Sequence, residues 1–317
     1  RRRSATEPAR CRPRAVTCAI YGGGTVSTEG APPVQLTVLG CRSGMPADGQ
    51  ASSGYLVRAG ATTLLLDCGP GVATAYSAAT TPAELTAVVI SHLHSDHCYD
   101  LLPLGKALLG ARIAAIVAER GGTSFDAGRL LDRDGAVGVP LYVPEGGREV
   151  LGRLAALFPV TTLPVLDRAF EIGFDVREYR PGEQIELPDC RISLHPLRHA
   201  APNCGVRIET ASATLAYTGD TGMTDALDPL AHDVDMLLAE ATLDATDTSG
   251  HGHLSAADAG RVAQRNGVRE LVLTHFSSAD SAVLDARRRA AATEFSGLIR
   301  IAGPGLRFPI LARAGRR

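Results

Sequence analysis

His92-Leu93-His94-Ser95-Asp96-His97 directly follows Ala87-Val88-Val89-Ile90, an apolar run rich in β-branched residues that predicts a buried strand. Side chains alternate along an extended chain, so the first two histidines point the same way and can bind one cation. The aspartate and the third histidine follow as the chain turns, and they can bind a second cation beside the first. Zinc and similar cations favour imidazole and carboxylate ligands. A solvated turn is the alternative, but three of the chain's nine histidines fall within these six residues.

Polar residues also come at the ends of other predicted strands. Strands predicted at 61–67, 214–218, 236–239 and 271–274 end at or just before Asp67, Asp220, Glu240 and His275. Helices are predicted at 72–79 and 256–266, the second with Ser255 as N-cap and Asp258 at its third position, and short strands over 170–197. This order predicts an α/β fold, in which strand ends along one sheet edge can gather a site.

The composition is that of a globular protein. At 317 residues, the chain can form one large domain or two small ones, and its 45% apolar and 21% charged shares are ordinary. The most apolar stretch, 101–118, is interrupted by Pro103, Lys106 and Arg112, so we expect no membrane span. The seven cysteines form no C-x-x-C pair, which fits a reducing cytoplasm. Residues 121–138, rich in glycine and aspartate, predict a mobile loop or a plain surface insertion.

Residues 1–33 predict a basic, disordered N-terminal extension, and folded sequence is expected over 34–317. Residues 1–25 carry six arginines against one acid and lack the apolar core of a secretory signal. They are a basic arm, an organelle-targeting peptide, or sequence that is not naturally translated. In the last case, Tyr21-Gly22-Gly23-Gly24-Thr25-Val26 would be read-through of a ribosome-binding site before a GTG start at Val26. The remaining chain is acidic, which makes nucleic acid an unfavourable partner.

Further motifs flank the histidine stretch in a fixed order. Leu66-Asp67-Cys68-Gly69 precedes it, and Leu197-Arg198-His199, Tyr217-Thr218-Gly219-Asp220-Thr221 and Leu273-Thr274-His275-Phe276 follow it. The series resembles that of the metallo-β-lactamase superfamily, which implies an αββα sandwich and a catalytic domain over 34–317. Gly205-Val206-Arg207-Ile208, Glu240-Ala241-Thr242 and His251-Gly252-His253-Leu254-Ser255 resemble the ribonuclease Z-type phosphodiesterase branch.

The resemblance implies a dinuclear metal site. One metal would be bound by His92, His94 and His199, the other by Asp96, His97 and His275, with Asp220 as the bridge. The bridge also has a physical reason, because two cations a few ångströms apart need an anion between them. A metal-bound hydroxide would be the nucleophile, and Asp96 could also orient it. We expect two divalent ions, zinc or manganese. Histidine and carboxylate ligands do not by themselves distinguish these metals from iron.

The resemblance and the chemistry of histidine together assign a proton donor. His253 is expected to be the general acid or to stabilise a phosphate oxygen. Glu240 would hold His253 in orientation, and Asp67 would do the same for a ligand imidazole. We expect no direct role for the remaining histidines and tyrosines considered, which are His251 in an exposed loop, His195, His232, Tyr55 and Tyr217.

The substrate class depends on weaker signals, because the same constellation also hydrolyses lactams, thioesters and sulfate esters. Ribonuclease Z enzymes that grip tRNA usually carry a long arm between the third-histidine and G-D-T motifs, whereas only residues 200–219 separate His199 from Asp220. The chain also resembles actinobacterial atypical class II cyclic-nucleotide phosphodiesterases, although Ser95 stands where the typical class II pattern has leucine.

We therefore expect hydrolysis of a small phosphodiester, a 3′,5′-cyclic nucleotide such as cyclic AMP, to the 5′-monophosphate. A ribonuclease acting on RNA 3′ ends is the first alternative, and an ester, lactone or lactam hydrolase is the second. A metal-dependent binding protein without turnover is the third. The resemblance also allows the protein to form a homodimer.

Overall fold

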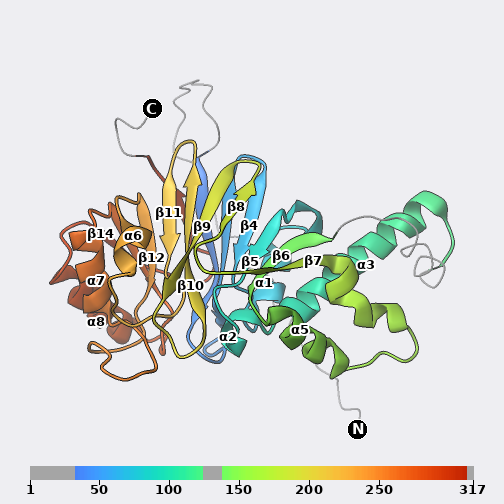
Figure 1. Cartoon of the computed structure of the whole chain (residues 1–317), viewed down its shortest axis with the longest axis horizontal. Helices are drawn as coiled ribbons and strands as arrows, with labels where there is room; N and C mark the ends of the chain where they lie inside the picture. Colours follow the sequence, from blue (N-terminus) through green and yellow to red (C-terminus); the bar gives the residue numbers. More distant parts are fainter. Residues whose placement is uncertain (1–32, 124–137, 313–317) are drawn as a thin grey trace, which may run out of the picture. The chain divides into compact units, whose positions relative to one another are not determined.

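The computed structural model describes residues 33–123 and 138–312, and two β-sheets dominate this part of the chain (Figure 1). The first sheet has the strand order β15-β1-β3-β4-β5-β6-β7, with β2 paired to β1. Its strands are β1 (Val34–Arg42), β2 (Ala51–Ser52), β3 (Gly54–Ala59), β4 (Thr62–Leu66), β5 (Ala87–Val89), β6 (Val139–Pro144), β7 (Phe174–Tyr179) and β15 (Arg307–Ile310). The second has the order β14-β13-β12-β11-β10-β9-β8. Its strands are β8 (Gln184–Leu187), β9 (Cys190–Leu197), β10 (Asn203–Thr210), β11 (Thr214–Tyr217), β12 (Met236–Glu240), β13 (Glu270–Thr274) and β14 (Leu298–Ile301).

Both sheets are mixed. Strands β4 to β7 are parallel in the first sheet, and β11 to β14 are parallel in the second. The remaining neighbours pair antiparallel, apart from the short β2. Parallel strands end at the same sheet edge, so the segments that follow β4, β5, β11, β12 and β13 gather there.

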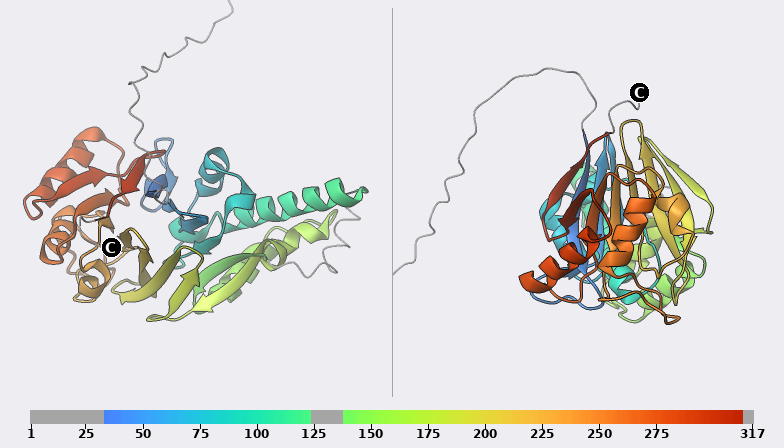
Figure 2. Two further views of the ribbon diagram at one scale, coloured as in Figure 1. Left: turned by 90° about the horizontal axis from the view of Figure 1, so that it is seen from above. Right: turned by 90° about the vertical axis from the view of Figure 1, so that its left-hand side faces the viewer.

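Helices cover the outer faces of both sheets (Figures 1 and 2). The first sheet is covered by α1 (Val72–Ala79), α3 (Leu101–Arg120) and α5 (Gly147–Ala156), with α2 (Ser95–Cys98) at its edge. The second is covered by α6 (Leu227–Ala231), α7 (Ala256–Arg265) and α8 (Ser281–Ala292). Three short helical turns, η1 (Pro82–Glu84), η2 (Pro164–Arg168) and η3 (Ala169–Gly173), complete the described elements. This arrangement confirms the αββα sandwich.

Alternation along β4 shows how the first sheet buries both of its faces. Leu64 and Leu66 belong to the cluster shared with the second sheet, whereas Leu65 between them packs with Tyr76 and Leu104 under the helices. All three leucines of β4 are fully buried. A strand buried on both faces explains why its sequence is an uninterrupted apolar run.

The helix that follows the histidine motif, α3, is long and apolar. Together with the preceding turn it spans Ser95–Arg120, which by length and composition alone could cross a membrane. Leu101 and Leu104 pack in the core under the first sheet, and Leu109 and Ile113 pack in a separate cluster with residues that include Ile172. This burial gives the apolar residues of α3 a packing role.

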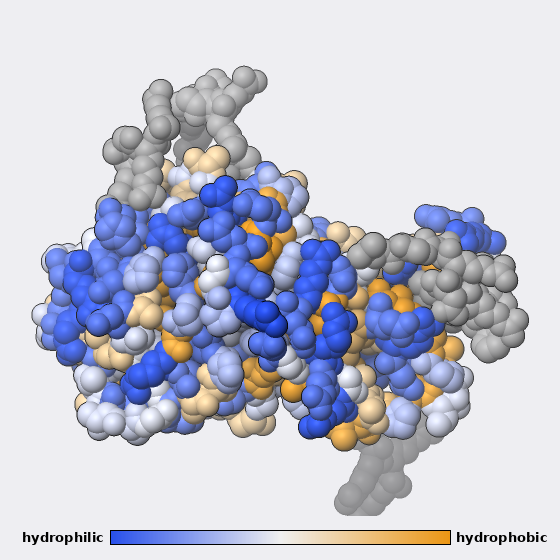
Figure 3. All heavy atoms as spheres, viewed as in Figure 1, coloured by the Kyte–Doolittle hydropathy of each residue, from blue (hydrophilic) through white to orange (hydrophobic). Residues whose placement is uncertain are grey.

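Figure 3 shows mostly hydrophilic residues on the face seen in Figure 1, with hydrophobic ones in small separate patches.

The predicted helices at 72–79 and 256–266 are confirmed, and the Ser255 side chain accepts a hydrogen bond from the backbone of Asp258 as predicted. The strand prediction was wrong at 170–173, which form η3. A side chain at Gly173 would come within 2.7 Å of the Gly105 carbonyl oxygen of α3, so close packing of two helical segments overrides the local apolar pattern. The predicted N-terminal extension, apart from residue 33, and most of the predicted 121–138 loop lie outside the described residues.

Candidate metal centre

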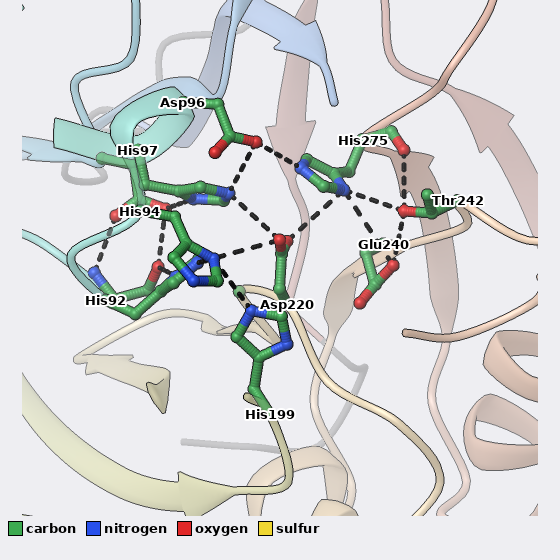
Figure 4. Close-up of polar contacts among 12 residues, drawn as sticks. His92, His94, Asp96, His97, His199, Asp220, Glu240, Thr242 and His275 are labelled. Atoms are coloured by element: carbon green, nitrogen blue, oxygen red, sulfur yellow. Dashed lines mark hydrogen bonds and ion pairs between the residues drawn. The ribbon is translucent and has the colours of Figure 1, made fainter. Parts of the chain in front are cut away.

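Strand ends bring the predicted ligands together at one edge (Figure 4). His92 lies just beyond β5, Asp220 just beyond β11, and His275 directly after β13. Helix α2 carries Asp96 and His97, and His199 follows β9 on the antiparallel side of the second sheet. His275 and Asp67 both have left-handed backbones, with φ of 60° and 57°. Such conformations are costly for non-glycine residues and concentrate at functional sites.

A first donor group consists of His92, His94, His199 and Asp220. His94 Nδ1 lies 3.1 Å from His92 Nε2 and 3.1 Å from His199 Nε2. Ligand atoms around a tetrahedral zinc are expected to lie about 3.3 Å apart, given zinc–nitrogen distances near 2.0–2.1 Å. Burial lowers the pKa of His92, His94 and His199, so these rings are neutral. A neutral imidazole is the form that binds a cation.

A second donor group consists of Asp96, His97, Asp220 and His275. His275 Nε2 lies 3.2 Å from Asp96 Oδ2, and His97 Nε2 lies 3.3 Å from Asp220 Oδ2. Asp220 belongs to both donor groups, and Figure 4 shows it between them. A carboxylate in this place can bind two cations at once, which is the bridging role predicted for Asp220.

Two buried atoms at the centre lack hydrogen-bond partners. His97 Nε2 and Asp220 Oδ1 are both buried and form no hydrogen bond within the described structure. Burying such atoms without a partner is costly, and a cation between them would satisfy both. Burial alone would raise the pKa of Asp220, but His275 and His97 hold it well below its usual range, so the carboxylate is charged. The donor set and its charge therefore fit divalent cations.

The Nδ1 partners of four histidines assign a common tautomer. Nδ1–H of His97 donates to Asp67 Oδ2 at 2.7 Å, and Nδ1–H of His199 donates to the Gly252 carbonyl oxygen at 2.8 Å. Nδ1 of His92 pairs with the Ser91 hydroxyl, and Nδ1 of His275 pairs with the Thr242 hydroxyl. Each Nδ1 partner thus fixes the orientation of its ring and leaves Nε2 as the atom that faces a cation. His94 is the exception, since its Nδ1 faces the other donors.

Asp67 accepts hydrogen bonds from several residues around the candidate metal centre. It is fully buried and accepts hydrogen bonds from the Ser91 backbone (2.7 Å), the Ser91 hydroxyl (2.8 Å) and the Tyr217 hydroxyl (2.7 Å), besides that from His97. It therefore reaches two predicted ligands, His97 directly and His92 through Ser91. This is the orienting contact predicted for Asp67. Tyr217, expected only to pack, lies against Tyr55 with the two rings tilted and also donates a hydrogen bond to this carboxylate.

His253 and Glu240 form a pair beside the two donor groups. His253 Nδ1 lies 3.0 and 3.1 Å from the two carboxylate oxygens of Glu240, and its ring lies 5.2 Å from that of His199 and 5.7 Å from that of His275. Burial disfavours the protonated ring, but the hydrogen bond and charge of Glu240, with Asp220 nearby, raise the pKa of His253. For Glu240, burial itself raises the pKa, because it disfavours the charged carboxylate. The pair can therefore hold a proton next to the candidate cations.

The loop that carries His253 is anchored by residues that the sequence analysis missed. Asp247 accepts hydrogen bonds from the backbones of Gly252 (2.8 Å) and His253 (3.2 Å). Arg198 donates to the carbonyl oxygens of Ser249 (2.9 Å) and Asp247 (3.4 Å). Because Arg198 directly precedes His199, the same short segment contacts both a predicted ligand and the loop of the predicted proton donor, His253. Their separation of about fifty residues in sequence gives no local signal of these contacts.

Two more residues were given no role in the sequence analysis: Ser91, which directly precedes His92, and Thr242, which appeared there only as part of the Glu240-Ala241-Thr242 motif. Thr242 donates to Glu240 at 2.6 Å and pairs with His275, so it links the two halves of the site. The side chain of His195 pairs with Ser193 and that of His232 with Asp233, so both lie apart from the site. His251 is exposed as expected, yet its ring lies 4.8 Å from that of His253 and 5.4 Å from that of His199.

Comparison with known proteins identifies the family. Residues 62–276 match the model described as the Beta-lactamase superfamily domain. The chain belongs to this superfamily. It is 30% identical to the probable metallo-hydrolase YhfI of Bacillus subtilis over 86% of this chain and 98% of that protein. It is 35% identical to the uncharacterized protein Rv1339 of Mycobacterium tuberculosis over 83% of this chain and 86% of that protein.

The chain is also 31% identical to the ribonuclease Z of Mycobacterium bovis, over 84% of this chain and 95% of that protein. The crystal structure of the metallo-β-lactamase fold protein YhfI from Bacillus subtilis superimposes with a TM-score of 0.69 and 27% identity, covering 87% of this chain and 98% of that one. The fold is thus the metallo-β-lactamase fold, and the chain lies in the branch that contains YhfI and ribonuclease Z.

Proposed function

We propose that this protein is a metal-dependent hydrolase that opens 3′,5′-cyclic nucleotides, cyclic AMP first among them, to 5′-monophosphates. The observation that carries the proposal is the His253–Glu240 pair, which lies next to two donor groups joined by Asp220. A phosphodiester needs charge neutralisation at phosphorus and a proton for its leaving oxygen. This edge of the sheet supplies residues for both.

Two divalent cations, which we propose to be zinc, would activate a water molecule and neutralise the charge on the phosphoryl oxygens when bound. The chain's own residues do the rest. Asp96, whose Oδ2 also accepts a hydrogen bond from the Gly44 backbone at 2.8 Å, is placed to orient the attacking water. Water adds to phosphorus and loses one proton to solvent as the bond to the 3′-oxygen breaks. His253 gives a proton to that oxygen, because Glu240 holds Nδ1 and leaves Nε2–H to donate.

Two features support a small substrate. Residues 200–219 are all described, and β10 and β11 pair as a hairpin that takes up most of this interval. No tRNA-gripping arm therefore lies between His199 and Asp220 in this described segment. The chain after residue 25 is also acidic, which disfavours a polyanion.

A second candidate function is processing of RNA 3′ ends, favoured by the relative that is named ribonuclease Z. The deciding experiment compares turnover of cyclic AMP and a precursor tRNA by the purified zinc- or manganese-loaded protein at physiological salt. The proposal expects cyclic AMP hydrolysis that His253→Ala reduces at least about a hundredfold. Cleavage of the tRNA with no hydrolysis of cyclic AMP would overturn the small-substrate assignment.

A further inference from the structure

A proline-lined cavity of about 330 Å³ lies beside the candidate metal centre. Its walls include Pro144, Pro181, Pro196 and Pro202 together with Leu197. We call this cavity the proline pocket. Its volume is at the lower end of the range for small-molecule pockets, about 300–1,000 Å³, so it suits one ring system rather than an oligonucleotide.

The proline pocket lies at the same edge of the sandwich as the predicted ligands. Pro144 ends β6, Pro181 follows β7, and Pro196 lies in the last part of β9. Strands β6 and β7 run parallel to β5, whose end leads into His92, so their carboxyl ends share that edge. Pro202 directly precedes β10, which pairs antiparallel with β9 and so begins at this edge.

The floor of the proline pocket contacts the metal-centre backbone directly. The Tyr179 hydroxyl donates to the carbonyl oxygen of Ile90 at 2.6 Å and lies 3.0 Å from that of Ser91, to which the Cys204 backbone donates at 3.1 Å. The Asn203 amide donates to the carbonyl oxygen of Asp220 at 2.8 Å. Ser91 directly precedes His92, so residues that line the pocket contact the backbone next to a predicted ligand. A group in the pocket can thus belong to a molecule whose phosphate lies at the metal centre.

The walls select the chemistry of that group. Proline side chains lose no rotamer freedom when they are covered, so a pocket built from four of them is pre-organised and costs little ordering entropy. Among the described lining residues the only charged side chain is Glu145, which is exposed and paired with Arg180 at 3.3 Å. An apolar wall with a carboxylate at its rim disfavours a second phosphate and favours a flat, uncharged ring.

We propose that the proline pocket binds the heteroaromatic base of the substrate nucleotide, which makes it the specificity pocket of this site. The inference rests on the proposed function, because it takes the group linked to the scissile phosphate to be a nucleoside. The base fills the apolar pocket, while the phosphate lies at the donor groups.

The test is binding of adenosine, which carries the base but has no phosphate to hydrolyse or to ligate a metal. Saturation-transfer NMR would use the purified full-length protein with adenosine at about 5 mM, since one ring system in such a pocket binds with a Kd near the millimolar range. Ribose 5-phosphate is the ligand control. Pro202→Trp places a large ring at the exposed rim and fills the pocket, and Pro188→Trp is the matched control at an exposed proline outside it.

We expect adenosine binding to the wild type and to Pro188→Trp, and at least a tenfold weaker signal for Pro202→Trp. We also expect Pro202→Trp to raise the KM for cyclic AMP at least tenfold with less effect on kcat. Absent or equal adenosine binding in all three proteins would overturn the inference, even if cyclic AMP is hydrolysed. Base binding that Pro202→Trp abolishes, without any cyclic AMP turnover, would uphold the pocket and refute the proposed function instead.

Discussion

Asp67→Asn tests whether the tautomers of the metal-centre histidines are set by their Nδ1 partners. Asp67 Oδ2 accepts hydrogen bonds from His97 Nδ1–H, the Ser91 hydroxyl and the Tyr217 hydroxyl. An asparagine amide at Oδ2 would donate instead of accept, so His97 would take the other tautomer, with the proton on Nε2. That is the atom that faces Asp220 at 3.3 Å. The variant should therefore lose one cation ligand while keeping nearly the same side-chain volume.

The expected magnitude follows from these contacts. Changing a residue that orients a ligand imidazole typically lowers metal affinity about 10–100-fold, or about 1.4–2.7 kcal/mol. Loss of charged hydrogen bonds at a fully buried carboxylate should also lower the free energy of unfolding by about 1–3 kcal/mol. The matched control is Asp235→Asn, because Asp235 is also buried and accepts hydrogen bonds from the backbone and hydroxyl of Thr214, remote from the site.

Zinc affinity would be measured by competition with a chromogenic chelator, and stability by urea denaturation of the metal-free proteins. Asp235→Asn should lose stability and keep the affinity of the wild type. Asp67→Asn should lose both. Equal zinc affinities for the two variants would refute the tautomer argument, whatever their stabilities.

Other predictions address the bridge, the proton donor and the cations. Asp220→Ala should lose at least one of two bound metals by elemental analysis, and unchanged metal content would count against the bridge. Glu240 raises the pKa of His253, so in the wild type the protonated acid persists to higher pH than for an ordinary histidine. Glu240→Gln should move the alkaline limb of kcat/KM to lower pH by about one unit, and an unmoved limb would exclude His253 as the acid. Thr242→Val should weaken zinc binding about tenfold, unlike Thr210→Val in the β10–β11 turn. Chelation should lower Tm by about 5–10 °C if the metal was present at a hundred times its Kd, since it binds only the folded state, and an unchanged Tm would contradict this.

The sequence predicted those parts of the structure that local patterns control. Apolar runs located most central strands, and polar residues at their ends predicted which side chains would meet. This succeeded because parallel strands share an edge, so adjacency in space follows from chain order. The Ser255 cap was predictable for a similar reason, since a capping box acts over three residues.

Contacts between distant segments could not be predicted in the same way. Arg198 reaches Ser249, and Tyr217 reaches Asp67, through side chains whose direction depends on the packing of the two sheets. The same holds for η3, where helix packing against α3 at Gly105 and Gly173 overrides an apolar pattern that resembles a strand. A single sequence carries no periodic signal for such contacts, so they appear only once the sandwich is assembled.

The charges at this edge explain why the cations and the proton donor should act as one unit. Asp67, Asp96, Asp220 and Glu240 are all buried, whereas burial keeps His92, His94 and His199 neutral. Burial also disfavours a charge on His97, yet Asp220 and Asp67 raise its pKa well above the usual range, so a proton there serves as the missing positive charge.

A divalent cation would displace that proton, because the cation needs the Nε2 lone pair. A cation in the first donor group would act on His253 through His199. Nδ1–H of His199 donates to the Gly252 carbonyl oxygen, and Gly252 directly precedes His253 in the loop held by Asp247. We expect binding at the first donor group to tighten the segment that carries His253. Metal loading should therefore order the 247–253 loop as well as the ligands, which makes amide hydrogen exchange of Gly252 and His253 a direct report of cation binding.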